Sequence, residues 1–170
     1  DFGGLKYGGR IDFLPFGLFT NMGQFRQADV MRERSLKLVV GFNYSFNNGI
    51  SSRRGREGGQ ILYLDSLGNE SLPDFIKMGA DLMLKYKGFS LLGEYQSTTS
   101  IVPDNITQRI RNNGTTSPSF LINGEENTEN YINNRLMLGS AYNLQLGYMF
   151  KNMFSLDARY THIDSDEFSF

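Results

Sequence analysis

Apolar and polar residues alternate with a period of two along six segments of this 170-residue chain. Alternation with this period is the pattern of a β-strand that has one apolar face and one polar face. The segments cover residues 6–14, 35–47, 75–86, 89–96, 139–150 and 154–163. Together they predict an all-β protein built from antiparallel strands.

Segment 35–47 has the clearest pattern. Large apolar residues occupy six alternate positions, which are Leu36, Leu38, Val40, Phe42, Tyr44 and Phe46. At a rise of about 3.3 Å per residue, a tilted strand of this length spans the ~25 Å apolar band of a membrane β-barrel.

The connections between the segments differ in length. Lys87-Gly88 is expected to form a two-residue turn, because Gly88 adopts positive φ without a steric cost. Residues 151–153 are expected to form a three-residue loop, which keeps Phe150 and Phe154 on one face. Long polar spans, roughly 48–74 and 97–134, join the opposite strand ends, and the apolar run 61–64 within them either extends a strand or forms a small loop sheet. Short turns at one rim and long loops at the other are typical of outer-membrane barrels.

The connection over residues 14–34 fits this scheme less well. It belongs to the rim with short turns, yet it is about twenty residues long. Additional strand pairing and a short helix near residues 28–34 are both compatible with its sequence.

Alternation alone also fits a soluble β-sandwich, and the aromatic residues favour the membrane. They concentrate near the predicted turns at one rim and again toward the other, as do rings at the two headgroup levels of a bilayer. The residues are Tyr86, Phe89, Phe150 and Phe154 at the first level, and Phe46, Tyr95, Tyr142 and Tyr160 at the second. Six strands are too few to close a membrane barrel. Either two more strands lie within the loops, or the chain is part of a larger barrel. We favour the second alternative and expect residues 1–170 to be a single partial β-barrel domain.

Composition narrows the function classes. The 17 Lys and Arg residues nearly balance the 18 Asp and Glu residues, which argues against a nucleic-acid partner. The chain has no cysteine, so neither a disulfide framework nor a thiolate metal site is expected. No run reaches the ~18–20 apolar residues of a membrane helix.

Several motifs resemble the phosphate-selective porin O/P family of outer-membrane porins, particularly its Bacteroidetes-type members. The first is Arg10-Ile-Asp-Phe-Leu-Pro-Phe-Gly17, a strand that runs into a Pro-Phe-Gly turn and is followed by Phe19-Thr20. Arg32-Glu33 before a strand, the hairpin 81–95, Gln145-Leu-Gly-Tyr and the stretch 158–164 follow in the family's order. The resemblance covers most strand-like sequence and little of the long loops.

The resemblance implies a barrel of roughly 16 strands, with short periplasmic turns and long extracellular loops, in the bacterial outer membrane. It also implies a homotrimer, contacts with outer-membrane lipid and lipopolysaccharide, and passive diffusion of small polar or anionic solutes such as phosphate. It implies neither an enzyme activity nor a cofactor.

Successive side chains of a strand point to opposite faces, so alternate positions along the predicted strands share one face. This places one set of polar residues on the face that would line the pore. These candidates are Lys6, Arg10, Asp12, Lys37, Asn43, Lys77, Asp81, Lys85, Glu94, Asn143, Gln145, Asp157 and Arg159. Their charges are of both signs, whereas the family's phosphate selectivity depends on concentrated positive charge. Neither anion selectivity nor, still less, phosphate selectivity is therefore carried over to this chain.

Three further features are candidate sites. The loop cluster Arg53, Arg54 and Arg56 either folds into the pore and attracts anions or is a solvated loop. The single histidine, His162, lacks the nucleophile motif of a Ser-His-Asp hydrolase. The acidic run Asp164, Asp166 and Glu167 lacks the remaining ligands of a calcium loop.

Three functions compete at this point. The first is a porin that forms a water-filled diffusion channel. The second is a non-conducting outer-membrane barrel that serves as an accessory subunit of a larger surface complex. The third is a soluble β-sheet module that binds ligands with its long loops, and an eight-stranded enzyme barrel is the weakest alternative.

Overall fold

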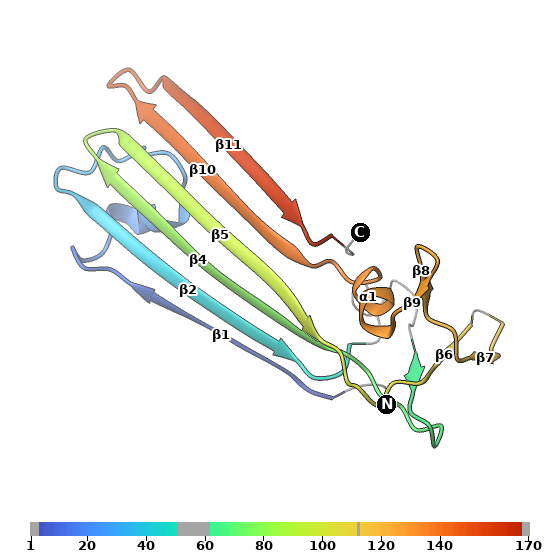
Figure 1. Cartoon of the computed structure of the whole chain (residues 1–170). Coiled ribbons are helices and arrows are strands. Elements are labelled where there is room, and N and C mark those ends of the chain that lie inside the picture. Colours follow the sequence, from blue (N-terminus) through green and yellow to red (C-terminus); the bar gives the residue numbers. More distant parts are fainter. Residues whose placement is uncertain (1–3, 51–61, 112, 168–170) are drawn as a thin grey trace.

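A single antiparallel sheet of six long strands dominates the computed structural model, which describes residues 4–50, 62–111 and 113–167 (Figure 1). In sheet order the strands are β1 (Lys6–Phe13), β2 (Lys37–Asn47), β4 (Asp74–Tyr86), β5 (Phe89–Ile101), β10 (Gly139–Met149) and β11 (Ser155–Ser165). All six predicted strands are confirmed. The main difference is that β5 continues to Ile101, five residues beyond its predicted end, pairing with the first residues of β4.

The two short connections have the predicted geometry. Tyr86 pairs with Phe89, and Lys87 and Gly88 between them have φ values of 48° and 97°. Positive φ at both central residues matches the right-handed twist of the flanking strands. At the other turn, the Phe150 N–H donates to the Phe154 carbonyl at 2.8 Å, so these residues face each other as expected.

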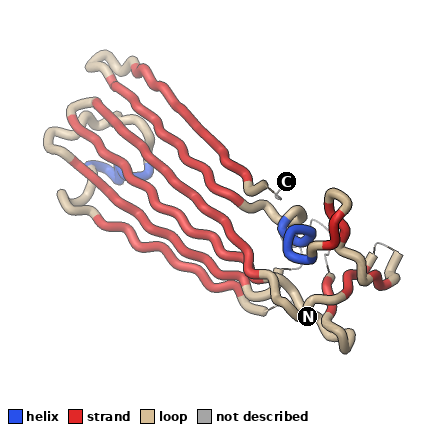
Figure 2. The backbone as a smooth tube through the Cα atoms, in the orientation of Figure 1, coloured by secondary structure: helices blue, strands red, loops and turns tan. Residues whose placement is uncertain are grey.

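The long loops form a small domain of their own at the opposite end of the sheet (Figure 2). It contains the three-stranded sheet β3 (Tyr63–Leu64), β6 (Gln108–Ile110) and β7 (Thr116–Ser117), the hairpin β8 (Leu121–Ile122) and β9 (Glu125–Glu126), and helix α1 (Thr128–Asn133). Their core is apolar and buried, and it includes Tyr63, Leu72, Phe120, Tyr131 and Ile132. Of the two interpretations of the apolar run 61–64, the small loop sheet is confirmed for Tyr63 and Leu64, while residue 61 lies outside the described residues.

Helix α1 was not predicted, because its six residues are too few to show a helical period. Its N-cap is Asn127, whose side chain accepts from the Asn130 N–H at 2.9 Å. No helix in the described ranges is long and apolar enough to cross a membrane.

The sheet is open within the described part of the chain. Strands β1 and β11 form its two edges, and neither pairs with a further strand there. The predicted all-β antiparallel class is confirmed, while barrel closure is not observed among the residues that the structure describes.

Candidate functional site

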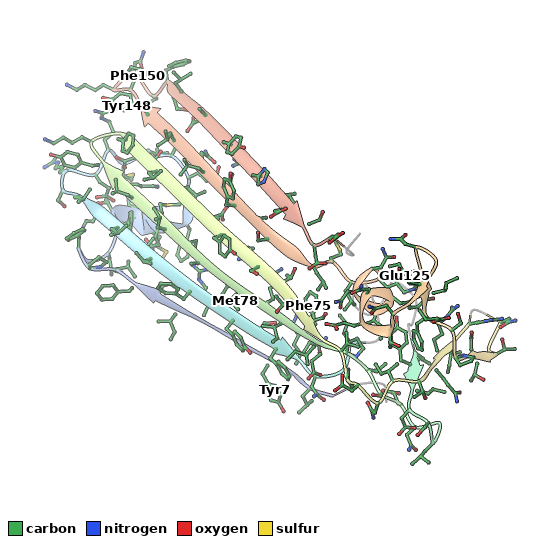
Figure 3. All side chains as sticks on the ribbon, in the orientation of Figure 1. Tyr7, Phe75, Met78, Glu125, Tyr148 and Phe150 are labelled. Atoms are coloured by element: carbon green, nitrogen blue, oxygen red, sulfur yellow. The ribbon has the colours of Figure 1, made fainter. Side chains whose placement is uncertain are left out.

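One face of the large sheet is apolar and exposed. Side chains project from it along every strand, as Tyr7 on β1 and Tyr148 on β10 illustrate (Figure 3). Ile11 is 75% exposed, Phe42 59%, and Leu156 66%. The other exposed large side chains on this face include Tyr44, Met78, Leu82, Tyr95, Tyr142, Leu144, Leu146 and Tyr160. Soluble monomers rarely expose apolar patches of this extent.

The opposite face is polar. Residues paired directly across antiparallel strands project to the same side, and the observed register brings all the predicted pore-lining residues onto this face. One row crosses the whole sheet through Asp12, Gly41, Asp81, Glu94, Asn143 and Thr161. The hypothesis that these residues share one face is therefore consistent with the structure.

Arg10 and two carboxylates form the main ionic network of the polar face. Its guanidinium donates to both carboxylate oxygens of Asp81, at 2.7 and 2.8 Å, and lies 2.7 Å from Asp12. Arg10 is on β1 and Asp81 is on β4, so the side chain must cross β2. It crosses at Gly41, where an added Cβ would overlap the guanidinium and lie 2.8 Å from Asp81.

Smaller networks continue toward β11. Asn143 donates to Glu94 at 2.7 Å, and Thr161 donates to the Asn143 amide oxygen at 3.0 Å. One row nearer the short turns, Arg159 donates to Gln145 at 2.6 Å. Charged groups of both signs thus bond to amides along this part of the face, which keeps it polar.

The residues between β1 and β2, named here the 14–36 segment, fold back over the polar face at the short-turn end (Figure 1). The segment contains a 3-10 helix, Thr20–Phe25, interrupted at Asn21 and Met22 by positive φ values of 49° and 55°. Neither feature that the sequence allowed for this connection is observed as expected. The segment adds no strand to the sheet, and its helix lies before residues 28–34 instead of within them.

An apolar contact seats the segment. Phe19 is 4% exposed and forms a buried cluster with Val39 and Met83. Leu92 packs against this cluster, and it lies in the same sheet row as Val39 and Met83. These apolar positions on an otherwise polar face are therefore covered by the segment.

Lys85 ties the segment to the sheet. Its side chain is 1% exposed, and its ammonium donates to the carbonyls of Gly23, Arg26 and Ala28 at 2.7, 2.5 and 2.8 Å. All three donors of the ammonium are thereby satisfied. The sequence interpretation of Lys85 as a pore-lining charge needs correction, because its ammonium contacts the segment and is shielded from solvent.

Two buried carboxylates join the segment to the β4–β5 turn. Asp29 accepts from the Gly88 N–H at 2.7 Å and from the Glu33 N–H at 3.0 Å. Glu33 accepts from the Thr20 N–H at 2.6 Å, and its carbonyl accepts from the Lys87 N–H at 2.8 Å. The segment and the turn therefore form one hydrogen-bonded unit.

The segment also reaches β10 and β11. Arg32 donates to the Met149 carbonyl, and its guanidinium lies 5.7 Å from the centre of the Tyr148 ring. Gln27 accepts from Arg159 at 3.3 Å. Residues 14–36 thus contact strands across most of the sheet width.

Sequence reasoning did not identify Asp29, Arg32 or Glu33 as positioned residues of this face. The sequence contains one indication of them: the connection over residues 14–34 is longer than expected at the rim with short turns, and it contains a run of charged residues. The contacts that join the segment to the sheet are long-range, for example Asp29 with Gly88 and Arg32 with Met149, and no local pattern encodes them.

The remaining candidate features have separate outcomes. Arg53, Arg54 and Arg56 lie outside the described residues. His162 lies on the apolar face, with its ring 5.3 Å from that of Tyr142. Asp164, Asp166 and Glu167 do not gather into a metal site, and no group of three or more acids or histidines suited to a metal ion exists in the described ranges.

No protein-family model matches this chain, and comparisons with curated proteins and with solved structures give no match either. The case for a function therefore rests on the residues and contacts described above.

Proposed function

We propose that this chain is part of an outer-membrane β-barrel porin whose polar face lines a water-filled channel for small solutes. The single observation that carries the proposal is the bare apolar face of the sheet, opposite a face built from Arg10, Asp81, Glu94 and other polar residues. A membrane barrel places lipid against the first face and water against the second.

The residues at the two borders of the apolar surface support strands that cross a membrane. Beyond Tyr95 and Tyr142, the same face continues with Ser97 on β5, and with Ser140 and Asp164 on β10 and β11. At the turn end, Phe150 and Phe154 pack with ring centres 5.9 Å apart. Aromatic residues at the borders of an apolar band are typical of strands that cross a bilayer.

The edges of the sheet favour a larger barrel. Unpaired strand edges are not tolerated in lipid, because their N–H and C=O groups would have no hydrogen-bond partner. The proposal therefore includes further strands that pair with β1 and β11, and the family resemblance adds a homotrimer. It does not include phosphate selectivity, since the Arg10 guanidinium is already paired with Asp81 and Asp12.

Conductance of the full-length protein in planar lipid bilayers tests this function. We expect stepwise current increases in potassium chloride. Arg159→Glu should shift the reversal potential in a salt gradient toward cations, because Arg159 lies on the polar face and bonds only neutral amides among the described residues. Lys87→Glu, in the exposed turn, is the matched control and should shift it less. A protein that is monodisperse without detergent and never conducts would contradict the proposal.

One observation favours a second candidate, a non-conducting accessory barrel. The 14–36 segment covers part of the polar face and is held there by Lys85 and Asp29. If it also fills the remaining channel, the barrel is membrane-bound but closed. Absence of conductance from a protein that integrates into lipid vesicles would support this candidate over the porin.

A further inference from the structure

We propose that a pocket at the long-loop end of the polar face binds organic anions that carry an apolar body, such as aromatic or short-chain carboxylates. Lys77 would bind the carboxylate. The inference deepens the proposed function and rests on it in one respect: solutes reach the pocket through the channel that the polar face lines.

The cations of the polar face differ in whether their hydrogen-bond donors already have partners. Arg10 is paired with carboxylates, Lys85 is bonded to carbonyls, and Lys37 donates to the Phe16 carbonyl at 2.8 Å. Lys6 and Lys77 are exposed, and neither has a hydrogen bond or an ion pair with another described residue. Both lie at the long-loop end, where an anion would meet an uncommitted positive charge.

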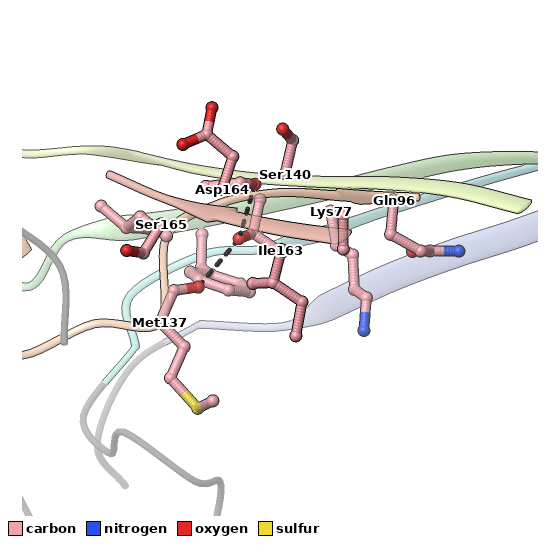
Figure 4. A pocket seen from close by; sticks show the side chains of 12 residues that line it. Lys77, Gln96, Met137, Ser140, Ile163, Asp164 and Ser165 are labelled. Atoms are coloured by element: carbon pink, nitrogen blue, oxygen red, sulfur yellow. Dashed lines mark hydrogen bonds between the residues drawn. The ribbon is translucent and has the colours of Figure 1, made fainter. Parts of the chain in front are cut away.

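Of these two lysines, Lys77 lines a pocket that does not include Lys6. The pocket has a volume of about 350 Å³ and lies between β4, β5, β10 and β11. This volume is within the roughly 300–1,000 Å³ that small-molecule sites occupy. Figure 4 shows Lys77, Ile163 and Met137 extending to the same side of the strands, whereas the carboxylate of Asp164 points to the other side. The nearby carboxylate therefore does not neutralise Lys77.

Apolar side chains form a large part of the pocket wall. Phe75, Ala141 and Ile163 occupy positions on the polar face, where the neighbouring strands otherwise carry amides, hydroxyls and charges. Ile163 is 74% exposed and Met137 is 56% exposed. Exposed apolar groups next to a lysine complement a solute that has both an apolar part and a negative charge, because covering the apolar groups adds to the attraction between the opposite charges.

Hydrogen bonds hold the pocket wall in place. The Thr98 hydroxyl donates to the Met137 carbonyl at 2.8 Å, and the Asp166 N–H donates to the Leu138 carbonyl at 3.2 Å. The Gln96 side chain also lines the pocket, and its amide oxygen is buried without a hydrogen-bond partner among the described residues.

Ligand-observed NMR of the full-length protein in detergent tests the site with benzoate as the probe. We expect benzoate to bind more tightly than acetate, which lacks the apolar body, and more tightly than benzylamine, which has the opposite charge. Lys77→Gln should weaken benzoate binding about tenfold, because it removes a charge-assisted hydrogen bond. Ile163→Asn should reduce the preference for benzoate over acetate.

Lys6→Gln is the matched control, since Lys6 is exposed on the same face but does not line the pocket. It should leave benzoate binding unchanged, and Lys77→Arg should retain it. Equal binding of benzoate and acetate, or benzoate binding that survives Lys77→Gln, would overturn the proposal. Conductance is measured separately: Lys77-dependent binding without conductance would reject the channel and keep the site, and conductance without such binding would do the reverse.

Discussion

Gly41 determines how charges meet on the polar face. The Arg10 side chain crosses β2 over this residue to reach Asp81, 71 positions away in the sequence. Parity along the strands was enough to predict that these three residues share a face. The ion pair itself could not be predicted, because it depends on the register of three strands and on a glycine at the crossing point.

Gly41→Ala should break this arrangement. The added methyl group would overlap the Arg10 guanidinium, so we expect the free energy of unfolding to fall by about 1–3 kcal/mol, as for other overpacked sites. Urea unfolding in lipid vesicles measures the change. Gly9→Ala on β1 is the control, because its Cβ would meet no atom within 4 Å. Equal effects of the two substitutions would contradict the role assigned to Gly41.

Lys85 shows that alternation along a strand predicts the face on which a residue lies but not what covers that residue. Its position on the polar face was predicted correctly, but its environment was not, because the covering residues come from a connection with no regular pattern. Burial of a lysine is tolerated only where its donors are satisfied. Three carbonyl acceptors meet that condition here.

Lys85→Met should loosen the 14–36 segment. The substitution keeps a side chain of similar length but leaves the three carbonyls without their common donor, at a cost of about 1–3 kcal/mol per unsatisfied group. We expect faster trypsin cleavage after Arg26, Arg32 or Arg34, followed by mass spectrometry. Lys6→Met, which removes a lysine without described partners, should leave the cleavage rate unchanged. Unchanged cleavage in Lys85→Met would show that the ammonium does not hold the segment.

At the scale of elements, the long strands followed from their alternating pattern, and the loops did not. Strand β5 was predicted to end at Gln96, because Ser97, Thr98 and Thr99 look like loop residues. Pairing with β4 carries it on to Ile101. The segment between β1 and β2 and the small loop domain depend on long-range contacts, such as those of Asp29 with the β4–β5 turn.

Gly88→Ala tests that coupling between the segment and the turn. Any alanine at φ 97° is strained, and here the methyl group would also overlap Arg32 and the Met149 carbonyl. Gly114→Ala is the control, since Gly114 has φ 82° but open space around it. We expect Gly88→Ala to lower the free energy of unfolding by about 1–3 kcal/mol more than the control does. Equal losses would mean that backbone strain alone accounts for the turn's sensitivity.

At the scale of the whole molecule, the two faces of one sheet carry the argument. Its apolar face has no cover within the described residues, and its polar face is partly covered by the 14–36 segment. The sequence predicted the faces because the period of a strand is two. It could not predict that the 14–36 segment covers part of the polar face, because the segment has no regular pattern and its contacts are with residues far away in the sequence.

Accessibility along β2 tests the central claim, that lipid meets one face and water meets the other. The chain has no cysteine, so single cysteines at Phe42, Asn43, Tyr44 and Ser45 can each carry a spin label in the full-length protein reconstituted into lipid vesicles. We predict that labels at Asn43 and Ser45 are relaxed mainly by a water-soluble nickel reagent, and those at Phe42 and Tyr44 mainly by oxygen dissolved in lipid. Equal access of the nickel reagent to all four positions, or the opposite alternation, would contradict the account.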